Sequence, residues 1–297
     1  MAQKGLSENL EKKLEEIKKT APEDGLFLYN GELYPAVACK PETLKILHTF
    51  KARRDDVVLV GYAKTGTNWV GHILIELEAA SGKYDEEERN RRKQQEKELK
   101  LMPYLEFGDP EKFQRMEKLP SRRIIRTHLI PQKIPKSFFE QNTKMLVLFR
   151  NPKDTAVSYF HFAKSMKLIS MPYGFYLDHI TEWNKYIDYK NVMFITYEEL
   201  KENTTLGLKR IAEFFEFSVT EKDIQSIEEK TNFKAMKDKA AETHGDIGQN
   251  FFRKGIVGDW KSIFSTDQSE EMDKKFEENV ARTRLGKMLK YEVYCKN

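Results

Sequence analysis

Residues 56–69 read Asp-Val-Val-Leu-Val-Gly-Tyr-Ala-Lys-Thr-Gly-Thr-Asn-Trp, and the fold expected for the chain follows from this stretch. Its apolar run predicts a buried strand. Two glycines then bracket a loop, and the residues after the second glycine predict the start of a helix. A strand, a glycine-bracketed loop and a helix N-terminus in this order typically bind phosphate through backbone N–H groups. The stretch therefore predicts an anion-binding loop.

The loop differs from the ATP-binding P-loop, whose pattern is G-x-x-x-x-G-K-[ST]. Gly61 and Gly66 match the two glycines, but Thr67 and Asn68 stand where that pattern requires Lys-Ser or Lys-Thr. The lysine lies inside the loop, at Lys64, and no hydroxyl stands where the Mg²⁺ ligand belongs. We therefore expect a nucleotide whose chemistry needs no metal ion.

The composition is that of an ordinary folded protein. The 297 residues are 39% apolar and 33% charged, which allows one large core. Lys and Arg number 51 against 47 Asp and Glu, so the net charge of +4 is too small to indicate a nucleic-acid partner. We expect a single domain over residues 1–297.

The sequence contains no evident targeting or anchoring signal. Apolar residues at helical spacing among charges predict an amphipathic helix over residues 1–20, not a signal peptide. No window is apolar enough to span a membrane, so no membrane association is expected. Cys39 and Cys295 are the only cysteines, which argues against a disulfide framework and a metal site. We expect a cytoplasmic protein.

Strand and helix patterns alternate along the chain, which predicts a mostly parallel sheet with helices on both faces. Apolar runs at 145–149 and 192–196 predict buried strands, and residues 68–80 predict a helix that starts on the anion loop. Residues 83–100 are almost all charged and are expected to be a solvated helical face or a charged excursion.

Four sets of polar residues follow predicted strands. They are Gly61–Gly66, Arg126–His128, Arg150 and Tyr197. Ligands of parallel sheets bind at the carboxyl ends of the strands, so we expect the four sets to converge on one edge of the sheet.

The loop at Tyr62–Trp69 resembles the phosphosulfate-binding loop of the cytosolic sulfotransferases, which transfer a sulfuryl group from 3′-phosphoadenylyl sulfate (PAPS) to a hydroxyl or amine. Further matches lie at Arg126–Leu129, Arg150–Asp154, Ser158–Phe162, Tyr197–Leu200 and Arg253–Lys261. The family more often has proline where Ala63 stands and serine where Thr65 stands. The resemblance implies a single α/β domain of P-loop type and PAPS as cofactor, released as adenosine 3′,5′-bisphosphate (PAP).

The resemblance also implies a role for individual residues. His128 is the implied general base, with Lys64 and Ser158 as further catalytic residues. The implied cofactor-binding residues are Lys64, Thr65, Gly66, Thr67, Asn68, Trp69, Arg150, Ser158, Tyr197, Thr231, Phe233, Phe252, Arg253, Lys254 and Gly255. Those expected to meet the acceptor are Arg126, Tyr104, Phe107 and Phe162. No residue is expected to bind a metal ion.

The chemistry of sulfuryl transfer supports two of these roles. The acceptor hydroxyl loses its proton as it attacks sulfur, and the imidazole of His128 is the side chain suited to take it. Negative charge grows on the bridging oxygen of the departing phosphate, where the ammonium of Lys64 would stabilise it. A structural histidine and a surface lysine are the alternatives.

Two segments depart from the family pattern. Ala163–Pro172 is shorter than the helix and loop that relatives carry beside the acceptor pocket, which predicts tight nucleotide binding with weak or broad acceptor activity. Lys261–Glu270 resembles the family's dimer motif with an altered centre, although Ser265 and Gln268 also fit a helix capping box. We expect a homodimer through Lys261–Glu270.

Two other functions stay open at this point. An ATP-dependent P-loop kinase is disfavoured by the place of Lys64 and by Arg150, which follows a strand where such enzymes need an aspartate. A cofactor-binding relative with little turnover is disfavoured by the intact Lys64, His128 and Ser158, but the short segment supports it. The acceptor is expected to be a small molecule, and an apolar pocket would fit phenols, sterols and amines alike.

Overall fold

The computed structural model describes residues 25–98, 104–165, 171–238 and 252–296. The helix predicted over residues 1–20 lies outside the described residues. The same holds for residues 166–170, the middle of the short segment.

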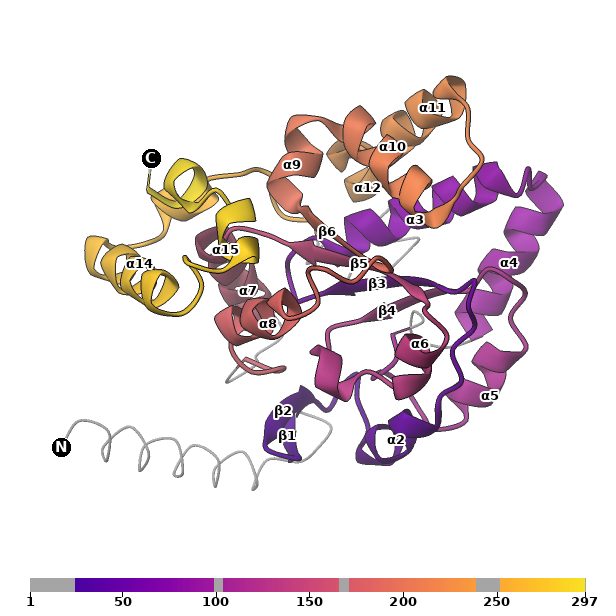
Figure 1. Cartoon of the computed structure of the whole chain (residues 1–297), viewed down its shortest axis with the longest axis horizontal. Helices are drawn as coiled ribbons and strands as arrows, with labels where there is room; N and C mark the ends of the chain where they lie inside the picture. Colours follow the sequence, from indigo (N-terminus) through magenta and orange to yellow (C-terminus); the bar gives the residue numbers. More distant parts are fainter. Residues whose placement is uncertain (1–24, 99–103, 166–170, 239–251, 297) are drawn as a thin grey trace.

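The centre of the fold is a parallel sheet of four strands in the order β4-β3-β5-β6 (Figure 1). The strands are β3 (Val57–Gly61), β4 (Ile124–Thr127), β5 (Lys144–Phe149) and β6 (Val192–Thr196). They are short and almost wholly buried, which is why they appear in the sequence as continuous apolar runs. Val60 lies beside Thr127 on one side and Val147 on the other, so the carboxyl ends of these strands are level. The predicted α/β fold with a central parallel sheet is confirmed.

Helices cover both faces of the sheet because successive strand residues point to opposite sides. Leu59 and Leu146 pack on one face, and Val58 and Val147 on the other. The first face is covered by α3 (Thr67–Ser81), α9 (Tyr197–Glu202), α10 (Thr204–Phe215) and α11 (Glu221–Thr231). The second is covered by α2 (Pro41–Ile46), α5 (Lys112–Glu117), α6 (Lys136–Glu140), α8 (Tyr176–Asn184), α14 (Thr266–Asn279) and α15 (Arg284–Met288).

The remaining elements lie around this core. They are the hairpin β1 (Leu26–Tyr29) and β2 (Glu32–Pro35), α4 (Glu86–Glu98), α7 (Pro152–Ser165), α12 (Phe233–Asp238), the 3₁₀ turns η1 (Leu47–Thr49), η2 (Pro131–Lys133) and η4 (Asp259–Ser262), and the π-helical turn η5 (Glu292–Lys296). Residues 83–100 were expected to be a solvated helical face or a charged excursion. Most of the described part of this segment is a helix, α4. Arg92, in the middle of this helix, packs back onto the preceding turn, with its guanidinium 4.1 Å from the ring centroid of Tyr84.

The helices next to the sheet edge begin where their capping residues predict. Gly66 precedes α3 with φ of +110°, and a Cβ atom there would lie 2.9 Å from the ring of Tyr197. Glycine is therefore required both for the backbone conformation and for the close approach. Asn151 caps α7, because its Oδ1 accepts the N–H of Asp154 at 2.8 Å and Pro152 is the first helical residue.

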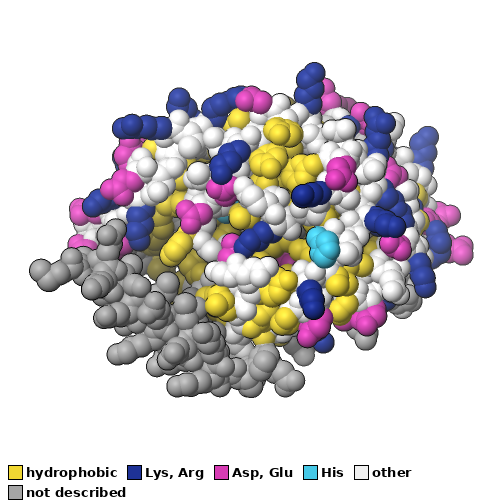
Figure 2. Space-filling model, turned by 60° about the horizontal axis from the view of Figure 1, so that its bottom comes forward, with side chains coloured by type: hydrophobic (Ala, Val, Ile, Leu, Met, Phe, Trp, Pro, Cys, Tyr) yellow, Lys and Arg dark blue, Asp and Glu magenta, His cyan; other side chains and the backbone are white. Residues whose placement is uncertain are grey.

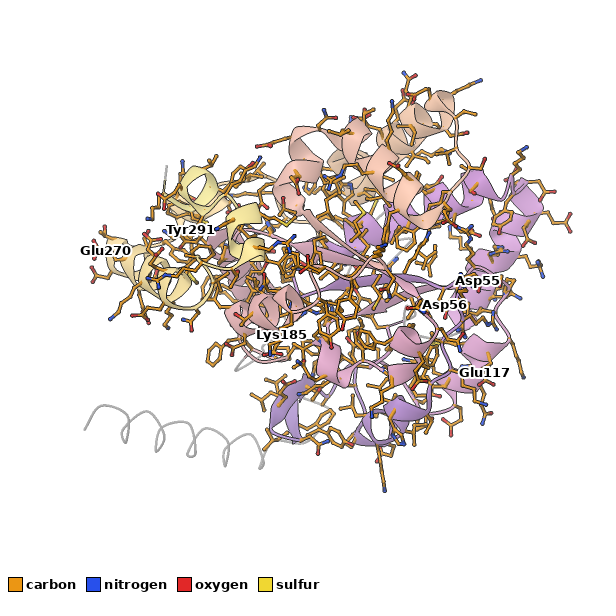
Figure 3. All side chains as sticks on the ribbon, in the orientation of Figure 1. Asp55, Asp56, Glu117, Lys185, Glu270 and Tyr291 are labelled. Atoms are coloured by element: carbon orange, nitrogen blue, oxygen red, sulfur yellow. The ribbon has the colours of Figure 1, made fainter. Side chains whose placement is uncertain are left out.

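The surface carries a mixture of side chains. Figure 2 shows hydrophobic, basic and acidic groups interspersed on one face, as the small net charge leads one to expect. Most charged side chains of the described residues are exposed or half-buried, and Figure 3 shows side chains projecting outward all around the ribbon. Asp56, at the amino end of β3, is an exception: it forms a buried ion pair with Arg123 at 2.6 Å.

Two features are absent from the described residues. None of the described helices combines the length and the apolar character needed to cross a membrane. No group of three or more His, Cys, Asp or Glu among the described residues is arranged to hold a metal ion.

Candidate active site

A cavity of about 440 Å³ lies at the carboxyl edge of the sheet. Its lining brings together Lys64 and Gly66 of the anion loop, His128 after β4, Arg150 after β5 and Tyr197 after β6. Ser158 and Phe162 reach the same cavity from α7. These residues therefore lie together at one edge of the sheet, where the sequence predicts them.

The anion loop is folded tightly back on itself. Thr65 Oγ1 is buried and donates to the carbonyl of Tyr62 at 2.7 Å. Lys64 has φ of +74°, and its Nζ lies 4.4 Å from the ring centroid of Phe162. Burial, with Arg150 and Arg253 nearby, lowers the pKa of the Lys64 ammonium to about 7.

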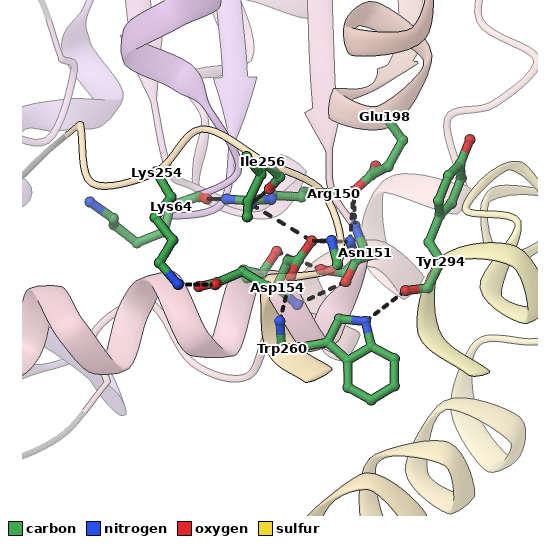
Figure 4. Close-up of polar contacts among 12 residues, drawn as sticks. Lys64, Arg150, Asn151, Asp154, Glu198, Lys254, Ile256, Trp260 and Tyr294 are labelled. Carbon is green, nitrogen blue, oxygen red and sulfur yellow. Dashed lines mark hydrogen bonds and ion pairs between the residues drawn. The ribbon is translucent and has the colours of Figure 1, made fainter. Parts of the chain in front are cut away.

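Arg150 connects the anion loop to the C-terminal part of the site. Its guanidinium donates to the carbonyls of Lys64 at 3.4 Å and Ile256 at 3.1 Å, and Figure 4 shows it between the two. The same group lies 4.4 Å above the ring of Tyr197. Arg150 is therefore fixed as a buried cation at the wall of the cavity.

Residues 252–260, here called the strap, bring two further cations to the cavity. Arg253 and Lys254 line it, and both pair with the buried carboxylate of Asp259. Gly255 has φ of +65°, and a Cβ atom there would lie 2.1 Å from the ring of Phe233. The strap thus combines positive charge with a main chain that approaches an aromatic side chain closely.

The strap is attached to α7 through a buried polar network (Figure 4). The carboxylate of Asp154 accepts the N–H groups of Gly258 at 2.7 Å and Trp260 at 3.0 Å. Asn151 donates through its side-chain nitrogen to Asp154 and Glu198, each at 2.8 Å. One network therefore holds the strap, the start of α7 and the start of α9 together.

An aromatic group closes the cavity beside the strap. Trp69 and Tyr197 meet edge to face with centroids 5.3 Å apart, and Phe233 and Phe252 pack with Trp69. The indole N–H of Trp69 donates to the carbonyl of Thr231 at 2.8 Å, which fixes the ring. Flat apolar walls of this kind suit a planar base.

His128 has only one ring nitrogen available to a ligand. Its Nδ1 lies 2.5 Å from the carbonyl of Gly61, so Nδ1 carries the proton and donates it to that oxygen. The lone pair then resides on Nε2. Burial, together with the nearby Lys64 and Arg126 cations, lowers the pKa of His128 to about 4, which keeps the ring neutral at pH 7.

The walls around His128 are aromatic and apolar. Tyr104 and Phe107 stack with centroids 4.4 Å apart, and Tyr104 lies 4.7 Å from the imidazole. Tyr173 lies 5.2 Å away on another side. Val37 and other hairpin-flanking residues complete this end of the cavity. The arrangement places an imidazole next to an apolar compartment, in the same cavity as a set of cations.

The chain was compared with known proteins. A family model described as "Sulfotransferase domain" matches residues 54–284. The chain belongs to the sulfotransferase family. Sulfotransferase 6B1 of Homo sapiens is 45% identical, over 97% of this chain and 97% of the relative, and that of Mus musculus is 44% identical, over 95% of each. The crystal structure of mouse sulfotransferase SULT7A1 complexed with PAP has a TM-score of 0.76 and 30% identity, over 89% of this chain and 98% of that chain.

The predicted PAPS-dependent sulfotransferase is thereby confirmed, and the kinase alternative is not favoured. Most residues predicted to form the site of this sulfotransferase line its cavity. They are Lys64, Gly66, Thr67, Asn68, Trp69, Tyr104, Phe107, His128, Arg150, Ser158, Phe162, Tyr197, Phe233, Phe252, Arg253, Lys254 and Gly255.

Three predicted site residues lie behind the cavity wall. Thr65 and Thr231 are buried and support the anion loop and Trp69. Arg126 belongs to β4 itself and does not follow the strand, and the alternation of the strand turns it toward α3. A Cβ atom on Gly71 of α3 would lie 2.4 Å from its guanidinium carbon. The predicted contact of Arg126 with the acceptor therefore receives no support from its position.

Sequence reasoning missed several residues of this sulfotransferase's site. Asp259, which pairs with the two strap cations, belongs to a matched motif but has no role of its own in the sequence prediction. Glu106 and Lys112 are buried beside Tyr104 and Phe107, and the sequence assigns neither of them a role. No sequence signal marks such residues, because Glu and Lys are expected at the surface by default.

Proposed function

We propose that this sulfotransferase transfers the sulfuryl group from PAPS to a hydroxyl or amine of a small molecule, by in-line displacement without a metal ion. The observation that carries the proposal is the shared cavity. Cations of the loop and strap line the same cavity as an imidazole with its lone pair on Nε2. We assign the part beside the strap cations to the donor, as the donor end, and the part around His128 to the acceptor, as the acceptor end.

The donor end has the side chains needed for an adenine nucleotide with two anionic groups. Backbone N–H groups at the start of α3 and the ammonium of Lys64 would hold the phosphosulfate. Arg150, Ser158 and the strap cations would hold the 3′-phosphate, and Trp69 with its aromatic neighbours would hold the base. When bound, PAPS supplies an activated sulfuryl group. The PAP in the related mouse structure supports this assignment.

His128 is proposed as the general base. Because Nδ1 is committed to Gly61, Nε2 is the atom that would receive the proton of the acceptor hydroxyl. The lowered pKa keeps this nitrogen unprotonated over the physiological pH range. Lys64 and Ser158 are proposed to act on the donor side, where charge develops.

The acceptor is proposed to be a compact molecule with an apolar body. Tyr104, Phe107, Phe162 and Tyr173 give the described part of this compartment an aromatic lining. Pro172, at the end of the short segment, lines the cavity too. We retain the prediction that the short segment leaves nucleotide binding tight and makes acceptor turnover weak or broad, because a shortened wall excludes water less completely.

Two further features are proposals with indirect support. A homodimer through Lys261–Glu270 is supported by the exposure of most of this stretch. It is weakened by the observation that Ser265 and Gln268 do form the capping box of α14. A cytoplasmic location is supported by the two cysteines, which are both buried and free.

An assay with labelled PAPS tests the function. A panel of phenols, alicyclic alcohols and arylamines should contain at least one acceptor that becomes labelled, in the presence of a chelator as well as in its absence. PAP should bind well, and adenosine 5′-monophosphate, which lacks the 3′-phosphate, should bind poorly. Tight PAP binding without transfer to any acceptor would instead support the non-catalytic relative, and a requirement for Mg²⁺ would contradict the metal-free mechanism.

A further inference from the structure

Two charged side chains that the mechanism above does not use are buried beside the acceptor end of the cavity. Glu106 and Lys112 are each 0% exposed. Burying a charge is costly unless other groups compensate it, so such residues are normally held by several hydrogen bonds. The contacts of these two residues therefore indicate what they do.

Lys112 fixes the main chain of one short segment. Residues 104–107, here called the acceptor wall, carry the stacked rings of Tyr104 and Phe107. The ammonium of Lys112, at the start of α5, donates to the carbonyls of Tyr104, Leu105 and Phe107. An ammonium has three donors, and all three are used here on one stretch of four residues. Lys112 thus holds the acceptor wall from behind.

Glu106 lies in the acceptor wall and holds the segment that carries the base. Its Oε1 accepts the N–H of His128 at 2.8 Å, and its Oε2 accepts the hydroxyl of Thr127 at 2.9 Å. The Thr127 hydroxyl accepts the N–H of Leu129 at 3.1 Å in turn. The carboxylate therefore fixes the main chain on both sides of the His128 ring.

We propose that Lys112 and Glu106 are a positioning pair that fixes the acceptor wall relative to His128. Lys112 sets the wall, and Glu106 transfers its position to the segment that carries the base. Neither residue is among those that line the cavity, so we expect the pair to govern acceptor placement and proton transfer more than nucleotide binding. The catalytic consequence of this pair rests on the proposed function. The hydrogen bonds of Lys112 and Glu106 are present whether or not the protein turns over a substrate.

Lys112→Met removes the three donors and keeps most of the side-chain volume. We expect the acceptor KM to rise and kcat/KM to fall on the order of a hundredfold, since small misplacements of reacting groups have effects of this size. PAP affinity, measured by calorimetry, should stay within about twofold. Lys118→Met is the matched control, because Lys118 is exposed and just beyond the end of the same helix; it should leave every parameter unchanged.

Glu106→Gln removes the charge and keeps the shape of the side chain. Because the amide holds the His128 segment less firmly, we expect kcat to fall more than the acceptor KM rises. Turnover is counted per PAP-binding molecule, using the calorimetric stoichiometry, so that unfolded protein does not enter the comparison. A purely structural role would lower that stoichiometry and leave kcat and KM of the remaining molecules unchanged, which would overturn the proposal.

Hydrogen exchange tests the positioning itself without an acceptor. The amide of Leu105 donates to the carbonyl of Arg126 at 2.9 Å, and that of His128 donates to Glu106. In Lys112→Met both amides should exchange about tenfold faster or more, while those of β3 keep the wild-type rate. Unchanged exchange at both amides, or equal acceleration throughout the sheet, would overturn the proposal. If the wild type binds PAP but transfers nothing, the proposed function fails. The exchange rates of the Leu105 and His128 amides still test the positioning pair in that case.

Discussion

His128 is the residue whose chemistry the site defines most narrowly. Its Nδ1 is committed to Gly61, so only Nε2 can accept a proton from an acceptor in the cavity. His128→Ala should therefore lower turnover on the order of a hundredfold or more, the range for loss of a general base. PAP affinity should survive, because the ring lies at the acceptor end.

The control for this experiment is His48→Ala. His48 is exposed and its ring contacts only the carbonyl of Lys45 on its own turn among the hydrogen bonds described, so activity should be unchanged. Full activity of His128→Ala, or parallel loss of PAP binding and turnover, would contradict the assignment of His128 as the base.

Lys64 gives a pH prediction whose sign follows from its pKa. In the nucleotide-free protein the pKa is lowered to about 7, so at pH 8 most molecules carry a neutral amine. A bound anion favours the ammonium and raises this pKa. PAP binding at pH 8 should therefore take up about one proton. Uptake should be far smaller at pH 5.5, where Lys64 is already charged. PAP affinity should accordingly decline as the pH rises through 7.

Calorimetry in buffers of different ionisation enthalpy measures this uptake. Lys64→Met cannot take up the proton, so its enthalpy of PAP binding should not depend on the buffer at pH 8. The same variant should lose more in kcat than in PAPS affinity, because the charge on the leaving oxygen develops only in the transition state. Equal proton uptake by wild type and variant would show that another group titrates.

At the scale of elements, the strap offers a matched pair of glycines. Gly255 and Gly258 both have positive φ, so alanine strains the backbone at either position. Only at position 255 does the added Cβ also collide with Phe233, one of the aromatic residues beside the cavity. Gly255→Ala should therefore weaken PAP binding about tenfold or more, and Gly258→Ala less than about threefold. Equal losses in the two variants would mean that strap strain alone, and not the aromatic wall, controls the affinity.

The elements that sequence reasoning predicted are those with strong local signals. Continuous apolar runs marked β5 and β6, and Gly66 and Gly82 bracket α3 as its pattern indicated. What remained hidden depends on tertiary contacts. Arg126 was expected to follow its strand, but β4 continues to Thr127, and the alternation of side chains within the strand turns Arg126 toward α3.

Buried charges were the second kind of omission. Lys112 and Glu106 have the composition of surface residues, and only the folded chain shows the carbonyls and N–H groups that hold them. Likewise the Arg253–Asp259 and Lys254–Asp259 pairs depend on the turn of the strap, which spacing alone does not reveal. The motif residues could be found from the sequence because their pattern resembles that of a known family. The supporting residues could not, because the contacts that hold them form only in the folded chain.

At the scale of the whole molecule, the segment Lys261–Glu270 continues directly from the strap into α14. Lys153 of α7 donates to Ser269 at 2.6 Å, next to the Asp154 network that holds the strap. Figure 3 shows Glu270 at the outer end of α14, at the edge of the molecule. A second copy docked on Lys261–Glu270 would therefore lie on the outside of the molecule, directly next to the strap along the chain.

Ile263 is the residue with which to test the predicted homodimer. Its side chain is 42% exposed and lies within Lys261–Glu270, so a second copy docked on this segment would cover it. Ile263→Asp would bury a charge in the interface and should convert the protein from dimer to monomer in sedimentation velocity. Val293→Asp, at a 55% exposed position on η5, is the control that should leave the dimer intact.

Because Asp154 anchors the strap within one chain, the monomeric variant should keep PAP affinity within about threefold of the wild type. A monomeric wild type, or the same assembly state in both variants, would remove the dimer from this account, whereas loss of PAP binding on dissociation would show that the second copy is needed to hold the strap.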